Sequence, residues 1–456
     1  MQVILNSINC LYNWLEQSKI AIISAVLLSL FLIARWYYFV NTYSVNVLFY
    51  DQWDFLNGLF YSDGLLDLYL YQHGPHRQGI GMWLIAFVNY LSDWNTQVDA
   101  NLVASFSFIS GISFLLLKQK ITGKRSFFDI IILLICLSPL QHGVFSNTPN
   151  VSHGTLPLFL ISLYGWSIFI KHKLKRYALI LVLDMLLIYT GFGFFMGLII
   201  PAYFIVEWIK ESNKKEQFKI LVALTLSLLF LASFFIDYSL QHFNESVLIE
   251  NPNPIDYMLF ILFGLSRIIG SVFSFNTAII IGAVGIVFIC YSYYRLTKKL
   301  YFLHHESKDY KVAILCFSLS LFTISYFIVT SIGRTKYGIE TAISTRYFPL
   351  LIPLYISLYY FICIYIKKNQ VALLISLFIT SFSSFYYPAE IRLMKEFKAM
   401  KTNWVTVYLE SGNSEMANKC EDCLIYPKDI FKAANIDEKI DYLKKNDLNL
   451  FIQQNN

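Results

Sequence analysis

Two aspartates, Asp51 and Asp54, lie three residues apart directly after the first long apolar stretch of the chain. In a chain that otherwise avoids charge, acid groups at a membrane surface indicate chemistry at the boundary between water and lipid. A carboxylate in such a place can act as a general base. The alternative is structural, with Asp51 capping a short helix and Trp53 anchoring it in the interface.

The composition places these residues in a membrane protein. Of 456 residues, 56% are hydrophobic and only 14% are charged, whereas a soluble domain is about one quarter charged. The apolar residues come in stretches of roughly 15–21, long enough for helices to cross the hydrocarbon core. The sequence therefore predicts an all-α polytopic membrane protein. The stretch 20–40 is too long for a cleavable signal peptide and predicts an uncleaved first helix.

The basic clusters predict how these helices are oriented. They lie near 118–125, 171–176, 210–219, 295–311 and 367–368, and the positive-inside tendency places all of them in the cytoplasm. Their spacing gives no indication of a nucleic-acid partner. We expect about eleven spans of the cytoplasmic (inner) membrane, with the N-terminus inside and the C-terminus outside: 20–40, 100–117, 127–141, 154–170, 177–190, 191–208, 219–236, 277–294, 311–330, 347–366 and 369–386. Two further apolar stretches, near 79–92 and 257–272, must then lie along the outer surface.

This topology divides the chain into a transmembrane module, residues 1–387, and an extracytoplasmic tail, residues 388–456. The first outer loop of the module covers 41–97. We expect the tail to be a small mixed domain with helices near 389–400 and 436–446. A structural disulfide is expected between Cys420 and Cys423 in an oxidising compartment, with a redox centre as the alternative. Asp184 is essentially the only ionisable residue expected inside a span.

A few basic residues fall on the outer side against the orientation signal: Arg77, Arg267, Arg334, Lys336 and Arg346. Because their position opposes the topology, we expect them to have a compensating use. An anionic lipid head group or a phosphate is the natural partner, and Arg offers it a bidentate geometry. The alternative is that these side chains reach back to head groups without specificity.

The residues of two regions resemble a known family. In residues 50–117, acidic residues open an outer loop, His76-Arg77 precedes a surface helix, and a second helix leads into the next span. The other region contains Ser344-Thr345-Arg346-Tyr347. Both are similar to GT-C glycosyltransferases, including the bacterial serotype-converting O-antigen glucosyltransferases. Related loops often carry a glutamate where this chain has Pro75, so the resemblance implies no third carboxylate there.

The resemblance implies a GT-C-like bundle and a function. The protein would move a sugar from a polyprenyl-phosphate carrier to a cell-surface glycan or lipid-linked acceptor, in contact with membrane lipids. Asp51 or Asp54 would be the catalytic base. The outer basic residues would bind the donor phosphate, namely Arg77, Arg267, Arg334, Lys336 and Arg346. Further contacts with substrate would come from Trp53, His73, His76 and Tyr347.

Other readings of the same residues remain open. Asp51 and Asp54 with His73 and His76 could hold a metal, but carboxylates and histidines favour different ions, so we expect no cofactor. The segment 191–197, rich in glycine, resembles an unwound helix and would suit a lipid-linked sugar flippase or transporter. A polymerase or ligase of surface polysaccharide is the alternative enzyme. The polar residues gathered on the outer face favour catalysis at the membrane surface.

Overall fold

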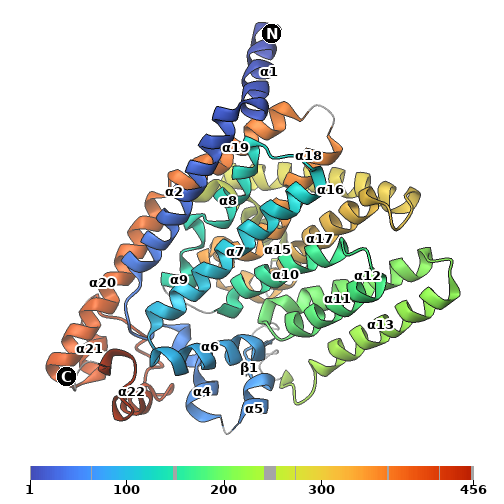
Figure 1. Cartoon of the computed structure of the whole chain (residues 1–456). Helices are drawn as coiled ribbons and strands as arrows, with labels where there is room; N and C mark the ends of the chain where they lie inside the picture. Colours follow the sequence, from blue (N-terminus) through green and yellow to red (C-terminus); the bar gives the residue numbers. More distant parts are fainter. Residues whose placement is uncertain are drawn as a thin grey trace.

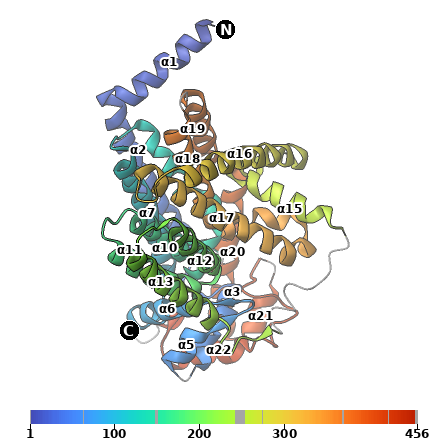
Figure 2. The ribbon, with the colours of Figure 1, turned by 90° about the vertical axis from the view of Figure 1, so that its right-hand side faces the viewer.

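The computed structural model describes residues 2–62, 64–146, 151–240, 253–272, 274–366, 369–420 and 422–452, and these residues are almost entirely helical. The only sheet within these residues is a small hairpin of two strands, each two residues long. In it, β1 (Gln72–His73) pairs antiparallel with β2 (His76–Arg77). The all-α class predicted from the sequence is confirmed. The N-terminus and the C-terminal region lie at opposite ends of the molecule in both views (Figure 1, Figure 2).

The chain begins with two long helices and a compact loop of short ones. These helices are α1 (Gln2–Gln17), α2 (Lys19–Tyr43), α3 (Asp51–Phe55), α4 (Asn57–Tyr61), α5 (Leu65–Leu70) and α6 (Gly79–Ser92). The helix expected at 79–92 is present as α6.

The main bundle follows the loop. Its helices are α7 (Thr96–Thr122), α8 (Ile130–Cys136), α9 (Gly143–Ser146), α10 (Thr155–Ile168), α11 (Lys173–Ile188), α12 (Phe194–Lys210), α13 (Lys214–Ser233), α15 (Ile255–Leu265), α16 (Phe275–Phe302), α17 (Lys308–Arg334), α18 (Ile352–Tyr365) and α19 (Gln370–Phe385). Short 3-10 segments connect several of them, and those used below are η2 (Pro139–Gln141), η4 (Gly191–Gly193), η5 (Ser266–Val272), η6 (Thr335–Tyr337), η7 (Ile339–Ile343) and η8 (Thr345–Leu350).

Local signals fix the ends of these helices. The side chain of Asn95 accepts a hydrogen bond from the Gln97 N–H and caps α7, and Gly123 ends it with a φ of +72°. Asn213 caps α13 in the same way, by accepting from the N–H groups of Lys215 and Glu216.

Seven helical stretches in the described part of the chain are long and apolar enough to cross a membrane. They are Lys19–Tyr43, Thr96–Thr122, Gly191–Lys210, Lys214–Ser233, Phe275–Phe302, Lys308–Tyr337 and Gln370–Ser411. Shorter apolar helical stretches cover three other predicted spans: Phe127–Gln141, Thr155–Ile168 and Ile352–Tyr365. The chain is therefore a multi-pass membrane protein by the length and composition of its helices.

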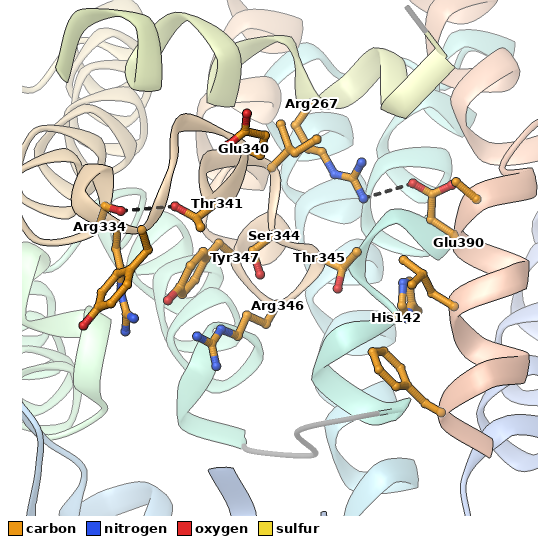
Figure 3. Close-up of a pocket in the computed structure, with 15 residues that line it drawn as sticks. His142, Arg267, Arg334, Glu340, Thr341, Ser344, Thr345, Arg346, Tyr347 and Glu390 are labelled. Carbon is orange, nitrogen blue, oxygen red and sulfur yellow. Dashed lines mark hydrogen bonds and ion pairs between the residues drawn. The ribbon is translucent and has the colours of Figure 1, made fainter. Parts of the chain in front are cut away.

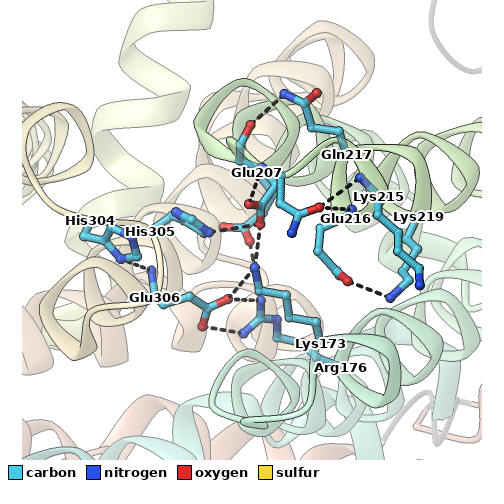
Figure 4. Close-up of polar contacts among 12 residues, drawn as sticks. Lys173, Arg176, Glu207, Lys215, Glu216, Gln217, Lys219, His304, His305 and Glu306 are labelled. Atoms are coloured by element: carbon cyan, nitrogen blue, oxygen red, sulfur yellow. Dashed lines mark hydrogen bonds and ion pairs between the residues drawn. The ribbon is translucent and has the colours of Figure 1, made fainter.

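Basic residues at one end of the bundle are held by acidic partners (Figure 4). Lys173 contacts Glu211 at 2.5 Å, and Arg176 and Lys311 each contact Glu306 at 2.7 Å. These ion pairs join the start of α11 to the end of α12 and the start of α17. Because Arg176 is buried, the loss of its partner would leave an uncompensated charge, which is strongly destabilising.

The expectation that only Asp184 is buried within a span is wrong. Asp184 is buried and accepts a hydrogen bond from Ser227 Oγ at 2.6 Å. Arg35 of α2 is also buried and donates to the carbonyl and hydroxyl oxygens of Ser384, at 2.6 and 2.7 Å. Glu207 of α12 is buried beside Arg176. Arg35 and Glu207 lie near the ends of predicted spans, where the sequence gives no sign of whether a charge points inward.

The tail is helical rather than mixed, since its described residues form no strand. It consists of α20 (Pro388–Ser411), α21 (Ser414–Lys419) and α22 (Ile436–Lys445), followed by the short η9 (Asn449–Phe451). The helices expected at 389–400 and 436–446 are present, the first of them twice as long as expected. The tail packs on the first loop, where the N–H of Tyr50 donates to the carbonyl of Ile425 at 2.8 Å and that of Asn449 to the carbonyl of Asp93.

Candidate functional site

The helix α3 carries both aspartates and is fixed by buried neighbours. Trp53 and Phe55 are buried in the core, and Lys439 of α22 donates to the Trp53 carbonyl at 3.0 Å. Tyr50, directly before α3, has a φ of +47°, which is uncommon for a residue other than glycine. The hydrogen bond from the Tyr50 N–H to the Ile425 carbonyl of the tail stabilises this conformation. Trp53 thus packs inside the protein and is not exposed to stack on a sugar.

The two aspartates have different partners although they share one helical turn. Asp51 Oδ2 accepts a hydrogen bond from Arg346 Nη1, an ion pair across 295 residues of sequence. Both oxygens of Asp54 instead accept from the hydroxyl of Tyr426, at 3.0 and 2.8 Å. The Asp51 side chain is 37% exposed, so a substrate can reach it.

Arg346 belongs to the wall of a cavity of about 540 Å³, which we call the arginine cavity (Figure 3). The segment from Arg334 through η8 forms one side, and α20 forms another. Its lining residues are His142, Arg267, Arg334, Tyr337, Glu340, Thr341, Ile343, Ser344, Thr345, Arg346, Tyr347, Ala389, Glu390, Leu393 and Phe397. The cavity thus brings together three of the five outer basic residues predicted to bind phosphate.

The three arginines are not equivalent. Arg267 is buried and paired with Glu390 at 3.1 Å, so its charge is already balanced. Arg346 pairs with Asp51. Arg334 makes no side-chain hydrogen bond or ion pair with any residue that the structure describes, and its guanidinium lies 5.8 Å from the Tyr337 ring. In Figure 3 the guanidinium groups of Arg334 and Arg346 flank the phenol of Tyr347.

A second, smaller cavity of about 90 Å³ shares Arg334, Tyr337 and Tyr347 with the arginine cavity and reaches His76. The His76 ring packs on Phe192 with centroids 4.4 Å apart. Burial, together with the positive charge of Arg334, lowers the pKa of His76 to about 3. His76 is therefore neutral at physiological pH. The His73 ring lies near Phe55, 6.1 Å between centroids.

Arg77 and Lys336 lie outside the arginine cavity. The Arg77 guanidinium is buried and donates to three backbone carbonyls, those of Leu70, Phe234 and Ile236. It therefore ties the hairpin to the end of α13 instead of presenting charge to a ligand. Lys336 lies 4.9 Å from the ring of Tyr337 in η6 and does not line the cavity.

Asp54 faces a different space, a cavity of about 300 Å³ that we call the Asp54 cavity. It lies between the first loop and the tail and is lined by Asp54, Asn57, Tyr61, Tyr426, Ile430, Ala433, Ala434, Asn435 and Lys439. None of the tail residues in this list is predicted from the sequence, because nothing in a polar tail indicates which side chains contact the first loop.

Two further predictions concern cysteines and metal. Cys420 and Cys423 form a disulfide, which closes the turn before Ile425 and Tyr426. No group of three or more His, Cys, Asp or Glu side chains suited to a metal ion occurs within the described residues. Asp51 and Asp54 have separate partners, Arg346 and Tyr426.

Comparison with known proteins adds no family to this geometry. No family model, curated protein or solved structure matches the chain. The function is therefore argued from the chemistry of the two cavities and from the residues that carry the GT-C resemblance.

The segment 191–197, which resembles an unwound helix in sequence, consists of the short connection η4 and the first turn of α12. Gly191 has a φ of +67° and opens η4, which connects α11 to α12. A side chain at position 191 would meet the carbonyl of Ser152 and the side chain of Gln78. Since Gln78 belongs to the first loop, this turn lies at the same end of the bundle as the arginine cavity.

Proposed function

We propose that the protein is a glycosyltransferase that uses a polyprenyl-phosphate sugar as its donor. The observation that carries this proposal is the ion pair between Asp51 and Arg346 at a cavity that also holds Arg334, whose guanidinium has no ionic partner in the described structure. A carboxylate beside cations is what the reaction needs, since an acceptor hydroxyl must lose a proton while a phosphate leaves.

In this proposal Arg346 and Arg334 bind the donor phosphate, and Asp51 accepts the proton of the acceptor hydroxyl. The bond between the sugar C1 and the phosphate oxygen breaks, the polyprenyl phosphate leaves with the electron pair, and the acceptor oxygen forms the new bond to C1. Arg267 is not assigned to the phosphate, because Glu390 already balances its charge. Arg77 is left out of the phosphate site because it does not line the arginine cavity and its guanidinium donates to three backbone carbonyls.

The ion pair between Asp51 and Arg346 means that binding of the sugar donor would also change the basicity of Asp51. A neighbouring guanidinium stabilises the ionised carboxylate, which makes Asp51 a weak base while the pair is intact. A phosphate that binds Arg346 competes for the same donors. The carboxylate is then released from its partner and becomes a stronger base at the moment when the donor is present.

The location belongs to the same proposal. The bundle would cross the cytoplasmic membrane about eleven times with the arginine cavity on the outer face, and the acceptor would be a surface glycan or lipid-linked glycan, such as O-antigen in a lipopolysaccharide envelope. The ion pairs that hold basic residues at the other end of the bundle are compatible with a cytoplasmic position for that end. The turn at Gly191 removes the main sequence feature that suggested a transporter.

The test is donor turnover by the purified protein in proteoliposomes that contain a radiolabelled polyprenyl-phosphate hexose and a cell-envelope glycan extract. We expect label to move from the lipid to the glycan, and Asp51→Asn to abolish this transfer. The matched control is Asp67→Asn, because Asp67 is an exposed aspartate in the same loop. Movement of intact donor across the bilayer without sugar transfer would instead identify a flippase.

A further inference from the structure

The Asp54 cavity is a second polar site, separate in its lining from the arginine cavity. One wall comes from the helices of the first loop, α3 and α4. The other comes from the segment around Tyr426 and from the start of α22 in the tail. Its volume of about 300 Å³ is at the lower end of the range for small-molecule sites.

The polar groups of this cavity are arranged around one carboxylate and one ammonium. Asp54 is held by the Tyr426 hydroxyl, so its two oxygens have a fixed direction and retain further acceptor capacity. Lys439 is buried and donates one hydrogen bond, to the Trp53 carbonyl. Asn57 Oδ1 is buried and accepts no hydrogen bond from any described residue. A buried acceptor without a partner costs free energy unless a ligand or water supplies the donor.

These features select among ligand classes. The single ammonium of Lys439 is balanced by Asp54, so the cavity does not favour an anion such as phosphate. One carboxylate is too few ligands for a metal cage. The apolar part of the lining is small and consists of Ile430, Ala433 and Ala434. This apolar surface is too small to bury a lipid chain. Fixed acceptors, amides and two tyrosine rings instead match a compact ligand with many hydroxyl groups.

We propose that the Asp54 cavity binds a neutral sugar unit, the residue of the acceptor glycan that receives the transferred sugar. Asp54, Asn57 and Lys439 hydrogen-bond its hydroxyls, and the rings of Tyr61 and Tyr426 border it. The word acceptor rests on the proposed function, whereas the binding of a neutral sugar does not.

Asp51 and Tyr426 both lie next to Asp54, since Asp51 is on the same short helix and the Tyr426 hydroxyl donates to Asp54. Burial, the hydrogen bond to Asp54 and the negative charges of Asp54 and Asp51 together raise the pKa of this tyrosine. The negative charge of Asp51 thus acts on a side chain that lines the Asp54 cavity. A sugar bound there can direct one hydroxyl toward Asp51, on the side where Arg346 would hold the donor.

The experiment is saturation-transfer NMR on the full chain in lipid nanodiscs. The probes are methyl α-glucoside, methyl α-galactoside, methyl α-mannoside and N-acetylglucosamine. Ala433→Trp fills the cavity from an exposed position, and Ala399→Trp makes the same change at an exposed alanine of α20 outside the cavity. We expect at least one probe to bind, Ala433→Trp to weaken that binding by about tenfold or more, and Ala399→Trp to leave it unchanged.

A second pair of variants separates this inference from the proposed function. Asp54→Asn should weaken the sugar signal by about tenfold, the usual effect of losing a hydrogen bond to a charged group. Arg346→Ala should leave it unchanged, because Arg346 lines only the donor side. Sugar binding that depends on position 433 would support the site even if no donor turnover is ever found. The inference is overturned if none of the four probes binds, or if Ala433→Trp binds a probe as well as the unchanged protein does.

Discussion

The arginine cavity, whose Arg346 pairs with Asp51, and the Asp54 cavity differ in charge, although the two aspartates belong to the same five-residue helix. The first is lined by three arginines and two glutamates, and the second by one lysine and one aspartate. The first is walled by α20 and by the segment that follows α17, and the second by short helices of the loop and tail. A cavity with excess positive charge suits a phosphate, and a balanced polar cavity suits hydroxyl groups.

The comparison teaches that the spacing of Asp51 and Asp54 matters less than what surrounds each of them. Residues three apart lie on one helix face, and the sequence therefore predicts one shared site, with one aspartate as the base and the other as a positioning acid. Arg346 approaches one aspartate from the bundle, whereas Tyr426 approaches the other from the tail. Under the proposed function, the two carboxylates therefore serve two different substrates.

The largest expected effect that would sharpen the comparison is at Arg346. Arg346→Ala should lower donor use by about a hundredfold or more, in the range seen when a charge-stabilising donor is removed. Arg346→Lys should remain impaired, because an ammonium keeps the charge but loses the bidentate fork. Transfer kinetics at varied polyprenyl-phosphate sugar measure this effect. The control is Arg392→Ala, since Arg392 is an exposed arginine of α20. Unchanged donor saturation in Arg346→Ala would place the phosphate elsewhere.

Arg334 should have a smaller effect in the same assay. Its guanidinium borders both the arginine cavity and the small cavity at His76, but it does not contact Asp51. Arg334→Ala should raise the donor concentration needed for half-saturation by about tenfold, the effect of one charged hydrogen bond, and leave acceptor saturation unchanged. A stronger effect on the acceptor than on the donor would mean that the two cavities are wrongly assigned.

Part of this site follows from sequence patterns, and part does not. Arg334 and Arg346 could be predicted because they oppose the orientation signal of a membrane protein and lie near each other in the chain. Arg77 also opposes the orientation signal, but its partners are backbone carbonyls at the end of α13. A pattern of side chains in the sequence cannot indicate a backbone carbonyl as a partner. Tyr426 and Lys439 reach Asp54 from more than 370 residues away, through folding contacts that no local signal encodes.

Arg77 therefore provides a contrast with the arginines of the cavity. Arg77→Ala would leave the buried carbonyl of Phe234 without its donor, at a cost of about 1–3 kcal/mol. We expect a lower thermal midpoint in detergent, measured by intrinsic fluorescence, with donor saturation of the remaining folded protein unchanged. If Arg77→Ala lost binding of the polyprenyl-phosphate sugar but kept the thermal midpoint of the unchanged protein, Arg77 would have to be assigned to the phosphate site.

A pH dependence of stability is expected at His76, with no effect on donor use. Its pKa is about 3 in the folded protein and near 6.5 when the side chain is exposed. Between these values the unfolded state binds the proton and the folded state does not, so stability falls as pH falls below 6.5. The slope from this group approaches about 1.4 kcal/mol per pH unit. His76→Gln should make the thermal midpoint less dependent on pH between pH 6.5 and pH 4.5. An unaltered dependence on pH would show that His76 accepts the proton in the folded protein.

The central claim is that Asp51 serves the transfer step and Asp54 the acceptor, and steady-state kinetics of Asp51→Asn and Asp54→Asn at varied acceptor test it most directly. Asp51→Asn should lower turnover at saturating acceptor by about a hundredfold to ten-thousandfold, as expected for the loss of a general base. Asp54→Asn should keep most of that turnover and require about tenfold more acceptor to reach half-saturation. Equal losses of turnover in the two variants, or near-normal turnover in Asp51→Asn, would contradict the division of roles between the two aspartates.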